Sequence, residues 1–180
     1  MRRVAFAAIL LAAIVARADE IEVRDVALRQ VEEGLALDAD FAFELTPRLA
    51  EVVANGVPLY FRVEFELARR RWYWFDDTAA SKRMHLRLSY HALSRQYRLS
   101  TGSLQQSFPT QEEALNVLKR VRNWVVVERE VRLADADYDA AVRMRLDTAL
   151  LPKPFQLSAL TGRDLQLDSP WKRFIVRSKS

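Results

Sequence analysis

Two stretches in which apolar and polar side chains alternate restrict the possible folds of this chain more than any other feature. In LYFRVEFEL, residues 59–67, every second side chain is apolar, and Arg62, Glu64 and Glu66 fall between them. LALDADFAFEL, residues 35–45, follows the same rule along most of its length. Because successive side chains of a β-strand point to opposite faces, a period of two indicates strands that are buried on one side. Such strands predict an antiparallel sheet with one wet face.

Further segments predict more strands and two short helices. Strands are also expected at residues 21–28, 84–90, 94–100, 103–108, 125–133, 138–146 and 171–176, and helices at residues 46–56 and 110–124. Thr46 and Thr110 would cap the helices, Gly34 suits a hairpin turn, and Pro152 and Pro154 flank a link without strand character. The pattern predicts a mainly β domain, an antiparallel β-sandwich or half-open barrel of about eight strands with two short covering helices.

Residues 69–77, RRRWYWFDD, lie where the strand of residues 59–67 ends. An unbroken period of two would bury Arg69 and Arg71, which is costly without partners. A bulge near residues 69–70 would instead turn Trp72 and Trp74 inward and leave the arginines at the rim. We therefore interpret this stretch as a strand end rather than as a partner site.

The first residues have the three parts of a secretory signal peptide. Arg2 and Arg3 precede an apolar run at residues 4–16, and Ala16 and Ala18 supply the small residues that signal peptidase requires. The run is shorter than the roughly 20 residues of a membrane-spanning helix. We expect cleavage after Ala18, export to the periplasm by a Sec-type route, and a single domain at residues 19–180; an uncleaved anchor is the alternative.

The charge of the mature chain argues against nucleic-acid binding. The whole chain carries a formal charge of +4, but three of its 28 basic residues, Arg2, Arg3 and Arg17, would leave with the leader, so that 25 remain against 24 acidic residues. A nucleic-acid-binding domain needs a clear basic excess on one face. With this near balance, and with export expected, we exclude nucleic acid as a partner.

Charge is nonetheless uneven along the chain. No acidic residue occurs between Asp77 and Glu112, and ten occur between residues 19 and 51. The acid-free interval holds Lys82, Arg83, His85, Arg87, His91, Arg95 and Arg98. One interpretation is internal, in which opposite charges on neighbouring strands attract, and this is the one we favour. The other is a positive face that recruits an anionic partner.

Catalytic and metal-binding patterns are weak in this sequence. The chain has no cysteine, and Ser89 and His91 would lie about 7 Å apart on one strand, too far for proton transfer. It contains no GxSxG elbow and no HExxH motif. ADADYD, residues 134–139, lacks the glycine and the distal glutamate of a calcium loop. We expect no catalytic residues, no metal ion and no cofactor.

Three blocks of the sequence resemble one family. RLSYHALSRQYRLSTGSLQQSFPTQEEAL, RMRLDTALLPKPFQL and SPWKRF are similar to the exported bacterial proteins of domain-of-unknown-function family 4390. The resemblance implies a proteobacterial envelope protein with no assigned reaction, and it suggests a membrane histidine kinase as a possible partner. The family pattern corresponds most closely to Tyr90, Arg95, Gln96, Tyr97, Arg98, Arg145, Asp147, Pro152, Lys153 and Pro154.

Three functions are considered. The first is a non-catalytic periplasmic interaction module that binds an anionic protein surface, such as the outer domain of a sensor kinase. Its candidate binding residues are Arg83, Arg87, Tyr90, His91, Arg95, Tyr97, Arg98, Arg145 and Asp147. The second is a carrier of a lipophilic ligand, whose apolar pocket would be lined by Trp72, Trp74, Trp124 and Trp171. The third is an enzyme acting on an anionic substrate in a basic cleft.

Overall fold

The computed structural model describes residues 20–69, 77–131, 133 and 136–177. Within them the chain forms nine strands, three α-helices and one 3-10 helix. The strands are β1 (Glu22–Val31), β2 (Gly34–Ala42), β3 (Leu59–Arg69), β4 (Asp77–His91), β5 (Gln96–Thr101), β6 (Leu104–Phe108), β7 (Arg120–Glu128), β8 (Asp137–Leu146) and β9 (Lys172–Arg177). The helices are α1 (Pro47–Ala54), α2 (Gln111–Leu118), η1 (Thr148–Leu150) and α3 (Lys153–Thr161).

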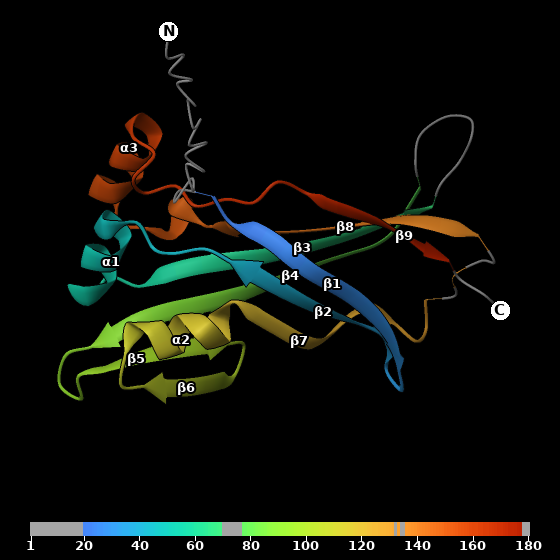
Figure 1. The fold of residues 1–180 in the computed structure, drawn as a ribbon, viewed down its shortest axis with the longest axis horizontal. Helices are drawn as coiled ribbons and strands as arrows, with labels where there is room; N and C mark the ends of the chain where they lie inside the picture. The colour runs from blue at the N-terminus through green and yellow to red at the C-terminus, as the bar shows by residue number, and fades with distance from the viewer. Residues whose placement is uncertain (1–19, 70–76, 132, 134–135, 178–180) are drawn as a thin grey trace, which may run out of the picture.

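The strands form two antiparallel sheets. The small sheet has the order β1-β2-β7, and the large sheet has the order β6-β5-β4-β3-β8-β9. The small sheet and α2 lie across one face of the large sheet, and α1 and α3 lie at one end of the molecule (Figure 1). The prediction of a mainly β, antiparallel fold is confirmed, and the two sheets do not close into a barrel.

The core lies between the two sheets, where the alternating stretches predicted it. The five apolar side chains of β3, Leu59, Phe61, Val63, Phe65 and Leu67, are fully buried. They pack with β2, from which Leu37 and Phe41 are buried, and with the apolar sides of α1 and α2. Burying each such side chain stabilises the fold by about 1.5–3 kcal/mol. The inner face of the large sheet therefore packs in the core, and its outer face is the one turned toward solvent.

The second predicted helix is too long, and a third helix was not predicted. α2 ends at Leu118 and β7 begins at Arg120, because the β-branched residues that follow pair with β2. Asn123 adopts φ 51° inside β7 and donates its backbone N–H to Asp38, a break in the ladder that periodicity does not show. α3 occupies the link around Pro154, since a proline in the first turn is compatible with a helix.

The predicted bulge and leader fall at the limits of the described residues. The pairing of β3 with β4 shifts register between Leu67 and Ala68, just before the predicted position. Trp72, Trp74 and residues 1–18 lie outside the described residues. Among the residues that the structure describes, no helix is both long and apolar enough to cross a membrane.

Candidate functional site

The outer face of the large sheet gathers six arginines from four neighbouring strands. Residues directly opposite each other on paired strands share a face, so the register decides which side chains meet. Glu64 of β3 lies opposite Arg83 of β4 and Arg143 of β8, and Arg62 lies opposite His85 and Arg145. We call the outer side chains Arg62, Arg83, Arg87, Arg98, Arg143 and Arg145 the arginine face.

Glu64 is the buried centre of this face. Its residue exposure is 5%, although it belongs to the wet side of an alternating strand. Arg143 Nε donates to Glu64 Oε2 at 2.6 Å, and Arg145 Nε lies 3.3 Å from the same oxygen. Arg62 Nε and Arg83 Nε each lie 3.6 Å from Oε1. One carboxylate therefore serves four guanidinium groups from three strands.

The arginines keep this carboxylate ionised. Burial would raise the pKa of Glu64, but the hydrogen bond from Arg143 and the charges of Arg145, Arg143 and Arg62 together outweigh it, and the pKa is lowered. A carboxylate with a lowered pKa is a poor proton acceptor at neutral pH. The geometry thus makes Glu64 an internal counter-ion that holds four cationic side chains in place.

Further contacts extend the cluster around Glu64 toward β9 and η1. Arg62 Nη1 lies 3.4 Å from Asp147 Oδ2, and the Arg143 guanidinium lies 4.3 Å from the centre of the Trp171 ring. Asp168 forms an isolated backbone β-bridge with Arg145; burial raises the pKa of Asp168, against the opposing charges of Arg145 and Arg143. Two predicted site residues, Arg145 and Asp147, are linked through Glu64 and Arg62.

Arg87 and Arg98 differ from the other four arginines. Neither forms an ion pair with any residue in the described part of the chain. Arg87 lies over the Tyr60 ring, 5.9 Å from its centre, and Arg98 lies opposite Ser89 and Ser107. The Nε of Arg98, like those of Arg62 and Arg145, is buried and has no hydrogen-bond acceptor among the described residues. These two charges are free to act on a partner.

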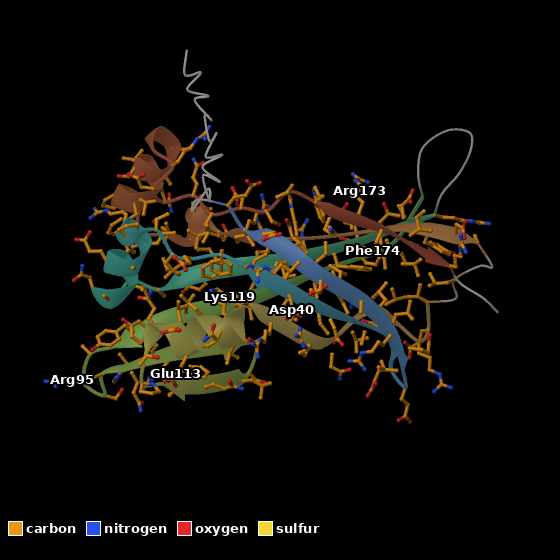
Figure 2. All side chains as sticks on the ribbon, in the orientation of Figure 1. Asp40, Arg95, Glu113, Lys119, Arg173 and Phe174 are labelled. Carbon is orange, nitrogen blue, oxygen red and sulfur yellow. The ribbon has the colours of Figure 1, made fainter. Side chains whose placement is uncertain are left out.

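Three other predicted binding residues, Tyr90, Tyr97 and Arg95, do not join this face. The rings of Tyr90 and Tyr97 lie on the inner side, tilted relative to each other with their centres 5.0 Å apart, because these residues have the same parity as the buried Leu88 and Leu99. Burial and the neighbouring Tyr90 raise the pKa of Tyr97. The turn after β4 carries Arg95, at φ 51°, and extends beyond one end of the sheet (Figure 2).

His91 lies on the outer face at the end of β4, opposite Gln96, whereas the two described tryptophans, Trp124 and Trp171, line no common pocket. His91 Nδ1 lies 3.0 Å from Ser94 Oγ in its own turn. Trp171 borders an open groove of about 1230 Å³, whose lining includes charged side chains from β1, β2 and β7. A smaller apolar cavity of about 220 Å³ lies between α2 and the sheets, and neither Trp124 nor Trp171 lines it.

Sequence reasoning missed Arg62, Glu64 and Arg143 as site residues. Each looked like an ordinary residue on the wet side of its strand, and the missing information was the pairing of β3 with β8, since Glu64 and Arg143 are 79 residues apart. A local sequence pattern cannot show that arginines of three strands meet at one carboxylate. The described residues contain no cluster of three or more His, Cys, Asp or Glu side chains that could hold a metal ion.

A family model matches most of the chain. The family model described as Domain of unknown function (DUF4390) matches residues 18–175, which confirms the resemblance noted in the sequence. No curated protein and no solved structure matches the chain. The match spans both sheets and every strand except the last residues of β9, so the chain belongs to the DUF4390 family.

Proposed function

We propose that the mature protein is a non-catalytic binding module of the periplasm, whose arginine face binds an anionic partner. The partner would be the acidic surface of an envelope protein, with the outer domain of a membrane histidine kinase as one example. The observation that carries the proposal is the pair Arg87 and Arg98, two cations on a wet sheet face without an ion pair among the described residues.

Residue chemistry and rigidity support binding. Arginine and aromatic side chains are enriched at the centres of protein interfaces, and this face combines six arginines with Tyr60 and Trp171. Four of the six guanidinium groups are held by Glu64, so these side chains lose little freedom on association. A fixed positive face also speeds encounter with an acidic surface.

The described titratable groups support binding over catalysis. Glu64 is held ionised by arginines, and His91 is hydrogen-bonded to Ser94 within its own turn. A general base has to be free to accept a proton near its substrate, and the ionised Glu64, held by arginines, does not meet that requirement. The arrangement instead resembles a recognition surface in which charge is fixed in position.

Reversing the two free charges should abolish partner capture. In intact cells, Arg87→Glu/Arg98→Glu is expected to reduce crosslinking to envelope partners by about tenfold or more, because a favourable charge pair becomes a repulsive one. The measurement is crosslinking with the exported protein as bait, followed by identification of partners by mass spectrometry.

The matched control makes the same charge change elsewhere. Arg24→Glu/Arg120→Glu alters two exposed arginines of the small sheet and should leave the captured partners unchanged. If both double variants capture partners like the wild type, the arginine face is not the binding surface. If both lose them equally, net charge and not the face governs association.

The proposed location has its own test. The protein recovered from the periplasmic fraction should begin at Asp19, because the residues at positions 16 and 18 match what signal peptidase requires. Intact-mass measurement after cell fractionation identifies the first residue of the recovered protein. A full-length chain starting at Met1 and recovered from the cytoplasm would contradict both the location and the proposed class of partner.

A further inference from the structure

We infer that Arg87 and Arg98, together with the hydroxyls around them, form a subsite for a tetrahedral oxyanion, in the cell a phosphoryl group. The inference rests on the proposed function for its location on an anion-binding face. It adds the chemistry of the ligand and separates the part of the face that binds it from the part that Glu64 already neutralises.

The register brings the two arginines close together. Arg87 lies opposite Ser100 and Arg98 lies opposite Ser89 on the paired strands β4 and β5. The two arginines are therefore diagonal neighbours on the outer face, with Cα atoms about 7–8 Å apart, within reach of one bound group. Ser107 of β6 lies on the far side of Arg98 and adds a third hydroxyl to this patch.

Electrostatics at this patch favour an anion. Two like charges on neighbouring strands repel each other, and the chain has no acidic residue between Asp77 and Glu112 to separate them. The outer-face carboxylates Glu64 and Asp147 already pair with other arginines. The buried Nε–H of Arg98 has no acceptor among the described residues, whereas buried donors are normally paired. An anion from a partner would satisfy both the charge and the donor.

The donor set suits a phosphoryl group better than a carboxylate. Two guanidiniums match the charge of a phosphoryl dianion, and their N–H groups with the serine hydroxyls outnumber what two carboxylate oxygens accept. The Arg87 guanidinium lies 5.9 Å from the centre of the Tyr60 ring and has no ion pair among the described residues, so its N–H groups can donate to an anion. The same face shows the contrast, since its carboxylate Glu64 pairs with four other arginines and with neither of these two.

Anion titration tests the inference directly. The mature protein is titrated with inorganic phosphate, and separately with acetate and succinate, at constant ionic strength, while arginine Nε–H and backbone resonances are followed by NMR. We expect phosphate to shift the resonances of Arg98 and Arg87 saturably and to bind at least tenfold more tightly than either carboxylate.

Single substitutions locate the site. Arg98→Gln and Arg87→Gln should each weaken phosphate binding about tenfold or more. Arg98→Lys should weaken it less, because lysine keeps the positive charge and loses only the planar, two-pronged donor geometry of the guanidinium. Arg24→Gln, which removes an exposed arginine of the small sheet, should change the affinity less than twofold. Circular dichroism of each variant verifies that the fold is retained.

Two further measurements identify the source of the phosphoryl group. Vesicles of phosphatidic acid in phosphatidylcholine, compared with phosphatidylcholine alone, test a lipid headgroup. If the protein binds the phosphatidic acid vesicles and Arg98→Gln does not, the subsite is supported and its ligand is a lipid headgroup. If the protein binds inorganic phosphate saturably but no vesicles, the subsite is supported and its ligand is a soluble phosphoryl compound.

The outcomes also separate this inference from the proposed function. Equal affinity for phosphate and succinate, or no saturable phosphate binding, overturns the phosphoryl subsite even if Arg87→Glu/Arg98→Glu still abolishes partner capture. Phosphate affinity that Arg87→Gln and Arg98→Gln leave unchanged overturns it as well. Phosphate binding at these arginines with undiminished partner capture by the charge-reversed variant supports the subsite and contradicts the proposed partner.

Discussion

Glu64→Gln is expected to lower the free energy of unfolding by about 3 kcal/mol, because removing one member of a buried ion-pair network leaves the others uncompensated. The carboxylate is buried and faces four guanidiniums, two of which, from Arg143 and Arg145, lie within 3.3 Å of one of its oxygens. For a domain of this size that loss corresponds to a melting temperature lower by about 10 °C. Urea unfolding and calorimetry measure both quantities.

The next outward carboxylate on the same strand is a matched control. Glu66 is exposed and lies opposite Ser81 and Ala141, neither of which is charged. Glu66→Gln should therefore change stability by less than about 0.5 kcal/mol. If the two glutamine variants are equally stable, the arginines do not depend on Glu64 and the cluster is not an organised unit.

Acidification should reproduce the effect of removing the charge. A carboxyl group whose pKa is lower in the folded protein than in the unfolded chain contributes stability above the ordinary glutamate pKa of about 4.3, and that contribution is lost as the pH falls through the folded value. The pKa of Glu64 is lowered in this way. The stability difference between wild type and Glu64→Gln should therefore be full at pH 7 and shrink below about pH 4.

Local patterns predicted the core of this fold well. The alternation of residues 59–67 identified five side chains of β3 that are all fully buried, and the threonine caps hold, with Thr46 Oγ1 and Thr110 Oγ1 each accepting a backbone N–H at 3.2 Å. These features depend on residues close in sequence, so a local pattern is enough to predict them. The helix of residues 110–124 was predicted too long because strand pairing with β2 decided its end.

The candidate site was less predictable because it depends on pairing between distant strands. Arg83, Arg87 and Arg98 were named from a charge pattern within one hairpin, and the structure places all three on the outer face. Glu64, Arg62 and Arg143 became site residues only through the β3–β8 register. The tyrosines failed to join the arginines for a simple geometric reason, since neighbours along a strand face opposite sides.

Gly34→Ala should destabilise the protein by on the order of 4 kcal/mol, through backbone strain and a clash with an adjacent strand. Gly34 follows the two-residue turn of the β1–β2 hairpin at φ +138°, a conformation that side chains disfavour. It also pairs with Glu128 of β7, and an added Cβ would overlap the carbonyl oxygen of Val127 and approach the amide nitrogen of Arg129 to 2.9 Å. Urea unfolding gives the change in free energy.

Gly102→Ala isolates the conformational part of this effect. Gly102 has φ +57°, and an added Cβ there has no neighbour within 4 Å, so alanine should cost only about 1 kcal/mol. Equal losses in the two variants would contradict the close approach of β2 and β7. Because Gly34 belongs to the small sheet and the arginine face to the outer side of the large one, Gly34→Ala should still bind partners at temperatures where it stays folded. A loss of binding without unfolding in that variant would mean that the two sheets are coupled, and that the arginine face does not act alone.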